Sequence, residues 1–316
     1  MNIVFAGTPP FASRHLEILL NHDFHISCVL TQPDRVSGRG KKFEPSPVKK
    51  LAINKGLDLF QPNSLREKDV LKKIQNLKPD LMLVVAYGLL IPKEMLEIPK
   101  IGCINVHGSL LPRWRGASPM EYSILHGDSK TGISYMKMTE GLDEGPVYEM
   151  HDCIIMPTEK LSDIEKKLIG LSETNLISFL RKIENDEIKC QEQDHGKATF
   201  APKITKKELQ IDWENIDSSG LVKKVNALSE KYGIHTFLGN KRIKIYEVSE
   251  VNTILATSPG EIEIQNDELI VGCKDGTKVR INKMQMEGKN QVNSREFLSA
   301  YIKLIEAFKY FSYKSE

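Results

Sequence analysis

The chain has 316 residues, about twice the length of a typical single domain, so the sequence predicts two domains that each bury a core. Its 40% hydrophobic and 27% charged residues are typical of a globular protein in water. The 44 Lys and Arg against 42 Asp and Glu leave a formal charge of +2. This balance excludes a surface coated with positive charge for non-specific nucleic-acid binding, but it does not exclude a local basic site.

The sequence shows no signal for membrane insertion or secretion. Its longest apolar run, residues 81–91, is shorter than the roughly 20 residues that span a bilayer, and the N-terminus lacks the basic region of a signal peptide. The chain has five cysteines without a C-x-x-C pair, and the apolar or strand-like surroundings of four of them indicate buried thiols in a reducing compartment. We therefore expect a cytoplasmic protein with no membrane partner. The sequence does not set the oligomeric state, and a monomer is compatible with it.

The first half of the chain alternates apolar strands with amphipathic helices, which predicts a Rossmann-like, doubly wound parallel sheet. Strands are predicted at 3–6, 26–30, 81–85, 103–106 and 132–138, and helices at 11–20, 65–77 and 161–183. Ligands of such sheets bind outside the carboxyl ends of the strands. A site is therefore expected in the segments that follow Ala6, Val85 and Val106.

The rhythm changes beyond a polar connector. Short strands separated by turns are predicted at 242–248, 261–264, 269–271 and 278–282, and a closing helix at 294–308. This pattern indicates a small β-barrel or sandwich. We therefore expect a Rossmann-like domain over residues 1–188, a linker over 189–207 and a second domain over 208–316.

The sequence gives no support for a dinucleotide or a metal. Gly7-Thr8-Pro9 follows the first strand without the G-x-G-x-x-G pattern, and no P-loop follows any strand. His22 and His25 are close in sequence, but a turn between a helix and a strand explains them better than zinc does. We expect no metal site.

The most informative stretch begins where the strand at 103–106 ends. Strand alternation sends Asn105 and His107 to the same side, and Gly108 permits a sharp change of direction. An amide and an imidazole at this edge could donate hydrogen bonds to an oxyanion while the imidazole handles a proton. Asp143, on a glycine-flanked loop after the strand 132–138, could add a carboxylate. Taken alone, these three side chains could equally be satisfied structural groups.

Here the sequence resembles a known family. Asn105-x-His107, the Ser-Leu-Leu-Pro run at 109–112 and Gly141-Leu142-Asp143 are similar to the signature of the folate-dependent formyltransferases. The run Arg-Trp-Arg-Gly-Ala-Ser-Pro at 113–119 looks most like the members that act on methionyl-tRNA. The similarity covers essentially the whole N-terminal domain and continues weakly into the C-terminal one.

The resemblance implies an enzyme that transfers the formyl group of 10-formyltetrahydrofolate, a co-substrate, to the α-amine of methionyl initiator tRNA for translation initiation. Asn105 and His107 would hold the formyl oxygen, and Asp143 would orient His107 and take part in proton transfer. No metal is implied. The folate pocket would be lined by Ser109, Leu110, Leu111, Pro112, Tyr87, Gly88 and Leu89. On sequence alone, the segment 85–92 could also be ordinary core.

A basic stretch follows the second predicted strand. Six Lys and Arg residues lie between positions 35 and 50, close to Asp34 and Glu44. Composition alone favours a solvated surface loop. The resemblance instead implies a loop that enters the acceptor arm of initiator tRNA, with Arg39, Lys41 and Lys42 as the tRNA-binding residues.

The resemblance also implies that residues 208–316 form an OB-like barrel that grips the tRNA stem. The sequence departs from the family at 226–233, where Asn-Ala-Leu-Ser-Glu-Lys-Tyr-Gly stands in place of the usual aromatic-proline turn. This departure leaves open what tRNA contact is made there.

Other functions remain open at this point. The acceptor could be a UDP-linked amino sugar, glycinamide ribonucleotide or water, and a protein of another class could bind RNA without catalysis. The basic stretch around Arg39 favours tRNA over the other acceptors. The presence of Asn105, His107 and Asp143 together favours an enzyme, because RNA binding alone requires none of them.

Overall fold

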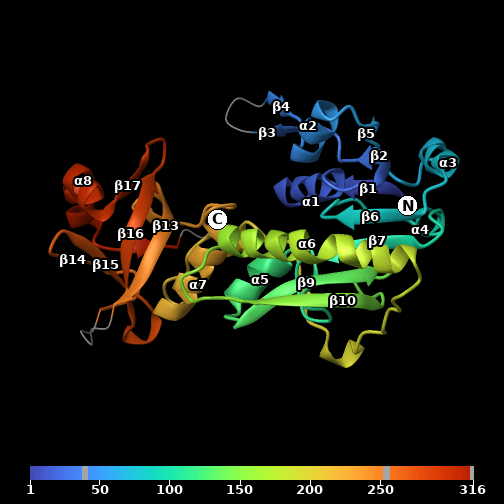
Figure 1. Cartoon of the computed structure of the whole chain (residues 1–316). Coiled ribbons are helices and arrows are strands. Elements are labelled where there is room, and N and C mark those ends of the chain that lie inside the picture. Colours follow the sequence, from blue (N-terminus) through green and yellow to red (C-terminus); the bar gives the residue numbers. More distant parts are fainter. Residues whose placement is uncertain (38–41, 252–256, 314–316) are drawn as a thin grey trace. The chain divides into compact units, whose positions relative to one another are not determined.

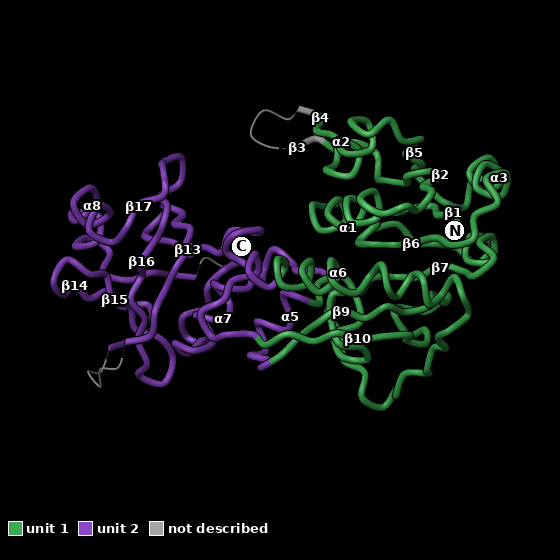
Figure 2. The backbone as a smooth tube through the Cα atoms, viewed as in Figure 1, with its two compact units in different colours: residues 1–119, 130–154, 165–202 green, residues 120–129, 155–164, 203–316 purple. Residues whose placement is uncertain are grey.

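The structure is a computed structural model that describes residues 1–37, 42–251 and 257–313. The chain forms two compact units (Figures 1 and 2). Unit 1 comprises residues 1–119, 130–154 and 165–202, and unit 2 comprises 120–129, 155–164 and 203–316. Unit 2 therefore takes two segments from within the stretch of chain that otherwise forms unit 1. No helix in the described part of the chain is long and apolar enough to cross a membrane.

Unit 1 is built on a mixed sheet with the strand order β10-β9-β7-β6-β1-β2-β5. Its strands are β1 (Asn2–Gly7), β2 (His25–Leu30), β5 (Leu59–Phe60), β6 (Leu81–Val85), β7 (Gly102–His107), β9 (Lys130–Lys137) and β10 (Val147–Ile154). Five neighbouring strands pair in parallel, in the order β7-β6-β1-β2-β5, as the Rossmann-like prediction requires. The Rossmann-like fold prediction is confirmed, and the sheet has in addition an antiparallel edge, where β9 pairs with both β7 and β10. A short loop joins β9 to β10, and only antiparallel strands can be joined without a long crossover.

Helices and two small ladders surround this sheet. The helices are α1 (Pro10–Leu20), α2 (Pro47–Asn54), α3 (Lys68–Leu77), α4 (Lys93–Leu96) and α6 (Leu161–Glu184), of which residues 165–184 belong to unit 1. Helix α5 (Pro119–Leu125) belongs to unit 2 from residue 120 onward. The ladders are β3 (Arg35–Ser37) with β4 (Lys42–Glu44) and β8 (Arg115–Gly116) with β11 (Phe200–Ala201). A short 3₁₀ turn, η1 (His195–Lys197), precedes β11. Helix α3 begins three residues later than its periodicity predicts, after Glu67 at the N-cap.

The core of unit 1 follows from the apolar strands. Val4 of β1, Leu30 of β2 and Val84 of β6 pack with Ile74 of α3 in one buried cluster. On helices α1 and α6, His15 and Ser172 are fully buried and form a 2.7 Å hydrogen bond. This bond joins the two helices, which lie side by side in Figure 1. The parallel strands thus share one packed core, which sets where their carboxyl ends lie.

Unit 2 contains a curled antiparallel sheet in the order β14-β15-β16-β13-β12-β18, with β17 beside β16. Its elements are η2 (Lys207–Leu209), α7 (Ser218–Leu228), β12 (His235–Leu238), β13 (Lys241–Val251), β14 (Ile262–Gln265), β15 (Glu268–Gly272), η3 (Lys274–Gly276), β16 (Lys278–Met286), β17 (Gln291–Asn293), α8 (Ser294–Phe308) and β18 (Phe311–Ser312). Hydrogen bonds from Phe311 N to Gly260 O (2.8 Å) and from Ile262 N to Lys309 O (2.9 Å) draw its outer edges together. This confirms the predicted barrel-like C-terminal architecture.

Helix α8 has the bounds that its periodicity predicts. Its N-terminus is a capping box, in which Asn293 accepts from Glu296 N and the Glu296 side chain accepts from Asn293 N. Such reciprocal bonds satisfy two backbone donors that a helix otherwise leaves free. The side chains of Asn293 and Glu296 therefore define where this helix begins.

Candidate active site

Three polar side chains come together at the carboxyl end of β7. Asn105 and His107 both come from that strand, and Asp143 comes from the loop between β9 and β10. Asn105 Nδ2 lies 3.4 Å from Asp143 Oδ1, and His107 Nδ1 lies 3.7 Å from Asp143 Oδ2. The structure thus brings the three predicted catalytic residues to one place, at the sheet edge where a doubly wound fold binds its ligands.

The orientation of His107 is fixed by the backbone. Its Nε2 lies 2.9 Å from the carbonyl oxygen of Trp114, and because a carbonyl can only accept, Nε2 carries the hydrogen. In the neutral ring Nδ1 therefore carries a lone pair, and this atom faces the Asp143 carboxylate. A proton taken up at Nδ1 would produce an imidazolium next to a carboxylate. The ring is thus placed to hold a proton and share it with Asp143.

The Asp143 carboxylate is held by a backbone donor. Gly116 N donates to Asp143 Oδ2 at 2.8 Å. Gly116 has a φ of +121°, and a Cβ at this position would lie 2.7 Å from the carbonyl oxygen of Ala201. Only glycine allows both this conformation and this close approach. Asp143 itself has a φ of +47°, an uncommon left-handed conformation for a residue other than glycine.

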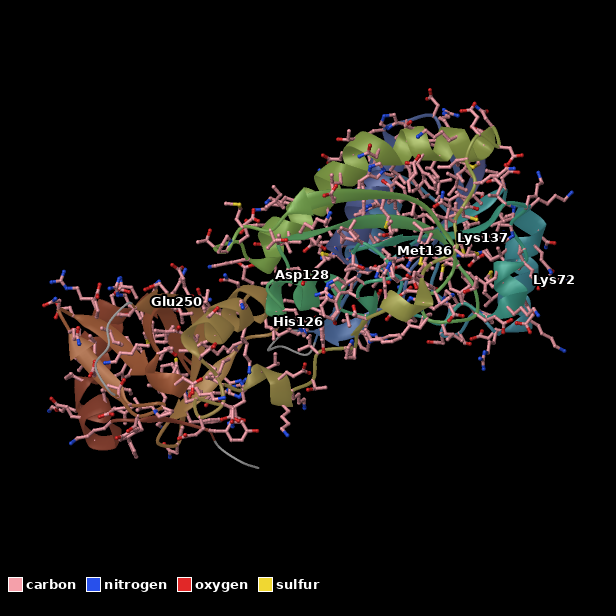
Figure 3. The ribbon with its side chains drawn as sticks, turned by 90° about the horizontal axis from the view of Figure 1, so that it is seen from below. Lys72, His126, Asp128, Met136, Lys137 and Glu250 are labelled. Carbon is pink, nitrogen blue, oxygen red and sulfur yellow. The ribbon has the colours of Figure 1, made fainter. Side chains whose placement is uncertain are left out.

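The loop after β7 is shaped by two serines. Ser109 Oγ donates to Arg113 O at 2.5 Å, while Ser134 Oγ donates to Ser109 O at 2.7 Å and accepts from Leu111 N at 3.1 Å. The peptide bond between Leu111 and Pro112 is cis. Leu111 packs on Met136 of β9, which is labelled in Figure 3, and on Val147. The predicted folate residues Ser109 and Leu111 are therefore buried within this loop, whereas Leu110 and Pro112 are partly exposed.

The segment 193–201, predicted as part of a linker, packs on this same loop within unit 1. Thr199 accepts from Trp114 N through its hydroxyl (2.9 Å) and from Arg115 N through its carbonyl (2.9 Å). Gln193 Nε2 donates to the carbonyls of Asp143 (2.9 Å) and Gly145 (2.7 Å). Sequence reasoning missed these residues, because their partners are distant in sequence. The polar run at 191–196, which has no obvious purpose in a linker, was the available signal.

The loop after β6 buries one of the remaining predicted folate residues and leaves the other two accessible. Tyr87 is only 2% exposed, and its ring belongs to the core cluster of unit 1. Gly88 is exposed and Leu89 is partly buried, so these two positions can face a ligand. The Tyr87 carbonyl accepts from Gln32 Nε2 (2.8 Å) and Thr8 Oγ1 (2.9 Å), which ties this loop to the ends of neighbouring strands.

The predicted tRNA-binding residues Arg39 and Lys41 lie outside the described residues. The ladder of β3 with β4 flanks them, and its last pair in register is Ser37 with Lys42. At the base of this ladder Lys49 Nζ donates to Asp34 Oδ2 at 2.7 Å. This hydrogen bond holds the pKa of the Asp34 carboxyl below its usual value.

The segment 226–233, where the sequence departs from the family, is anchored within unit 2. Glu121, which is 3% exposed, accepts from Lys231 Nζ (2.9 Å) and Tyr232 Oη (2.8 Å). Asn226 Nδ2 donates to Pro157 O at 3.2 Å. The segment 226–233 is therefore held by a buried carboxylate with two donors and by one backbone carbonyl.

In the described parts of the chain, no three His, Cys, Asp or Glu side chains are grouped so that they could hold a metal ion. The chemistry of the site described above rests on an amide, an imidazole, a carboxylate and backbone groups.

Two known family profiles match the sequence. The sequence profile described as "Formyl transferase" matches residues 1–180, and that described as "Formyl transferase, C-terminal domain" matches residues 203–301. The chain belongs to the formyl transferase family. The candidate active site lies within the first matched region, except for the segment 193–201, which lies between the two matched regions.

Individual relatives of this formyltransferase agree with the family assignment. The methionyl-tRNA formyltransferase of Kosmotoga olearia is 39% identical over 295 residues, which cover 92% of this chain and 94% of that protein. The structure of WlaRD, a sugar 3N-formyl transferase, superposes with a TM-score of 0.66 at 17% identity, over 92% of this chain and 99% of the other. The methionyl-tRNA formyltransferase from Clostridium thermocellum gives a TM-score of 0.57 at 18% identity, over 80% and 94%. These two structures share the fold.

Proposed function

We propose that this formyltransferase transfers the formyl group of 10-formyltetrahydrofolate to the α-amine of methionyl initiator tRNA, giving N-formylmethionyl-tRNA for translation initiation. The observation that carries the proposal is the 39% identity to a methionyl-tRNA formyltransferase over nearly the full length of both chains. Its five cysteines are free thiols, which suits a reducing cytoplasm, and we place the reaction there.

The chemistry sets what the residues must do. An amine attacks the formyl carbon, the bond from that carbon to the folate nitrogen breaks, and one proton passes from the amine to the departing nitrogen. Negative charge develops on the formyl oxygen during the attack. Asn105 Nδ2 and a protonated His107 Nδ1 are the donors we assign to that oxygen, in place of the present contacts to Asp143. One such donor is worth roughly 2.7–4 kcal/mol of transition-state energy.

The proton route is assigned to His107 and Asp143. The Trp114 carbonyl holds Nε2–H, so His107 gains or loses its second proton at Nδ1, the atom that faces Asp143. The Asp143 carboxylate can accept a proton from the attacking amine, directly or through water. Positioned acid-base groups of this kind contribute about 10²–10⁴-fold to a rate.

We assign the folate contacts to the two loops that border Asn105. Leu110 and Pro112 of the loop after β7, and Gly88 and Leu89 of the loop after β6, keep exposed surface. Apolar side chains beside exposed backbone polar groups suit the flat pterin ring, which is rich in donors and acceptors. The co-substrate 10-formyltetrahydrofolate supplies the formyl group. Ser109, Leu111 and the Tyr87 ring shape these loops from beneath.

We assign tRNA recognition to Arg39, Lys41 and Lys42. They carry positive charge in a protein whose formal charge is only +2, so charge-driven contact with phosphates would be concentrated there. An unpaired or easily opened acceptor end is the kind of feature by which proteins select among RNAs.

The proposed function is tested by competition between acceptors. The enzyme is given 10-formyltetrahydrofolate with charged initiator tRNA, charged elongator tRNA, glycinamide ribonucleotide, a UDP-linked amino sugar and water, and each formylated or hydrolysed product is quantified. We expect N-formylmethionyl-tRNA from the initiator to dominate. A dominant sugar, ribonucleotide or hydrolysis product would overturn the acceptor assignment while leaving formyl transfer intact.

A further inference from the structure

We propose that Gln193, held by Arg115, is a positioning residue for Asp143, so that the segment after α6 is a working part of the active site. This inference rests on the proposed function, because it takes Asp143 to act in formyl transfer. All residues involved lie in unit 1.

Gln193 holds the backbone on both sides of Glu144. Its Nε2 donates to Asp143 O at 2.9 Å and to Gly145 O at 2.7 Å. A side-chain amide has two N–H donors, so these two carbonyls use its whole donor capacity. Asp143 has a φ of +47°, which costs free energy unless the surroundings hold it there. The Gln193 amide supplies such a restraint at the aspartate itself.

Arg115 fixes which way the Gln193 amide points. Its Nε and Nη2 donate to Gln193 Oε1 at 3.0 and 2.8 Å, so the oxygen is committed to the guanidinium and the NH₂ group must face the Asp143 loop. Arg115 Nη2 also lies 3.2 Å from His195 Nδ1. Arg115 is 4% exposed and Gln193 is 8% exposed, so water does not compete strongly for these bonds.

The two ends of Asp143 are thus tied to one dipeptide. Its carboxylate accepts from Gly116 N, and its carbonyl is linked through Gln193 to the side chain of Arg115. Residues 115 and 116 form β8, which pairs with Phe200 and Ala201 of β11. The segment 193–201 therefore sets both the place of the Asp143 backbone and the place of its carboxylate, and catalysis depends on both.

The test uses Gln193→Glu in the full-length enzyme. Glutamate keeps the size of the side chain and strengthens the contact with Arg115, but it has no N–H to donate to the two carbonyls. Because misplacing a reacting group by about 1 Å can cost about 10²-fold, we expect kcat to fall roughly 10²-fold. We expect KM for each substrate to change less than about threefold, with thermal unfolding close to that of the parent. Gln191→Glu, which adds the same charge at an exposed position two residues away, should leave kcat unchanged.

A double variant separates positioning from a purely structural role. If Gln193 acts through Asp143, then Gln193→Glu combined with Asp143→Asn should be no slower than Asp143→Asn alone. An unchanged kcat in Gln193→Glu, or a further fall of the same size in the Asp143→Asn background, would overturn the proposal. If Gln193→Glu does not fold, Gln193→Met, which is uncharged and of similar length, makes the same comparison.

The acceptor used in these assays is the one that the competition experiment identifies. A wild-type enzyme that formylates another acceptor refutes the methionyl-tRNA assignment, and the Gln193 comparison is then made with that acceptor. The two proposals therefore fail separately.

Discussion

Gly116 N donates a 2.8 Å hydrogen bond to Asp143 Oδ2, so a glycine backbone holds the carboxylate that we assign to proton transfer. The two residues are 27 positions apart in sequence, and they meet because β7 and β9 are neighbours in the sheet. The loops that follow β7 and β9 therefore meet at the same edge.

Gly116→Ala should damage both stability and rate. The new Cβ would lie 2.7 Å from Ala201 O at a φ of +121°, so the backbone must move and carry the Asp143 donor with it. We expect a loss of about 1–3 kcal/mol in unfolding free energy and a fall in kcat of more than tenfold. Gly170→Ala, in the interior of α6 with nothing within 4 Å, is the control: it should keep kcat and raise the unfolding free energy by about 0.5–1 kcal/mol. A Gly116→Ala enzyme with unchanged kcat would show that this donor is dispensable.

Asp143→Asn should leave the fold intact and remove most of the rate. Asparagine can still accept from Gly116 N, but it has no negative charge to stabilise a protonated His107 or to accept a proton. We expect kcat to fall about 10²–10⁴-fold while folate binding is retained. Rapid-quench turnover and equilibrium folate binding measure the two effects. Glu144→Gln, the exposed neighbour, should behave as wild type, and near-normal turnover in Asp143→Asn would exclude Asp143 from the mechanism.

Asn105→Ala tests the oxyanion role. If Asn105 Nδ2 binds the formyl oxygen more strongly in the transition state than in the ground state, then kcat should fall about 10²–10³-fold with little change in KM. An increase in KM at constant kcat would instead indicate a residue that only binds substrate. Asn185→Ala, at an exposed position, provides the comparison.

Acid should destabilise unit 1 through His15. Burial lowers the pKa of this fully buried imidazole from 6.5 to about 4, partly offset by its bond to the Phe11 carbonyl. Between these values the unfolded chain binds a proton that the folded protein does not, so unfolding free energy falls as the pH drops from about 6.5 towards 4. The contribution is about 2 kcal/mol at pH 5. Urea unfolding at pH 7, 6 and 5 measures it.

His15→Gln is the control for this prediction. Glutamine can take up both neutral hydrogen bonds but does not titrate in this range, so it should flatten this part of the pH dependence. An equal slope in the variant and the parent would assign the acid sensitivity to other groups.

Arg39→Ala should weaken the binding of charged tRNA without affecting the binding of folate. Fewer phosphate contacts release fewer counterions, so KM for charged tRNA should rise and its dependence on salt should become shallower, by up to about one unit of log–log slope. Folate binding should not change. Arg66→Ala, which removes an exposed arginine of unit 1, serves as the control. Equal KM values for tRNA in Arg39→Ala and wild type would remove Arg39 from recognition.

The sequence predicted those elements of the fold that have a clear local pattern of apolar residues. The run Leu81–Val85 is buried throughout and forms β6 with the predicted bounds, because a strand covered on both faces is a continuous apolar stretch. Strand β10 was not predicted, since it lies at the sheet edge and mixes exposed Met150 and Ile154 with charged residues. Helix α7 was also missed, although Asp217 caps its N-terminus by accepting from Gly220 N.

The candidate site divides in the same way. Alternation along one strand sufficed to place Asn105 beside His107, and a glycine-flanked loop pointed to Asp143. The groups that hold them could not be found by local patterns. Gln193 is 50 residues from Asp143 and 78 from Arg115, and the Trp114 and Gly116 contacts use backbone atoms that carry no residue-type signal.

The interleaving of the two compact units has a consequence for shuffling and fusion of this gene. Glu121, encoded in the N-terminal half, finds its buried partners Lys231 and Tyr232 in the C-terminal half, within one unit. A chimera joined near residue 203 inherits one side of this contact from each parent. A relative with an apolar residue at position 231 or 232 would leave the carboxylate stranded. Crossovers in this family should therefore be chosen so that the segments 120–129, 155–164 and 203–316 all come from the same parent.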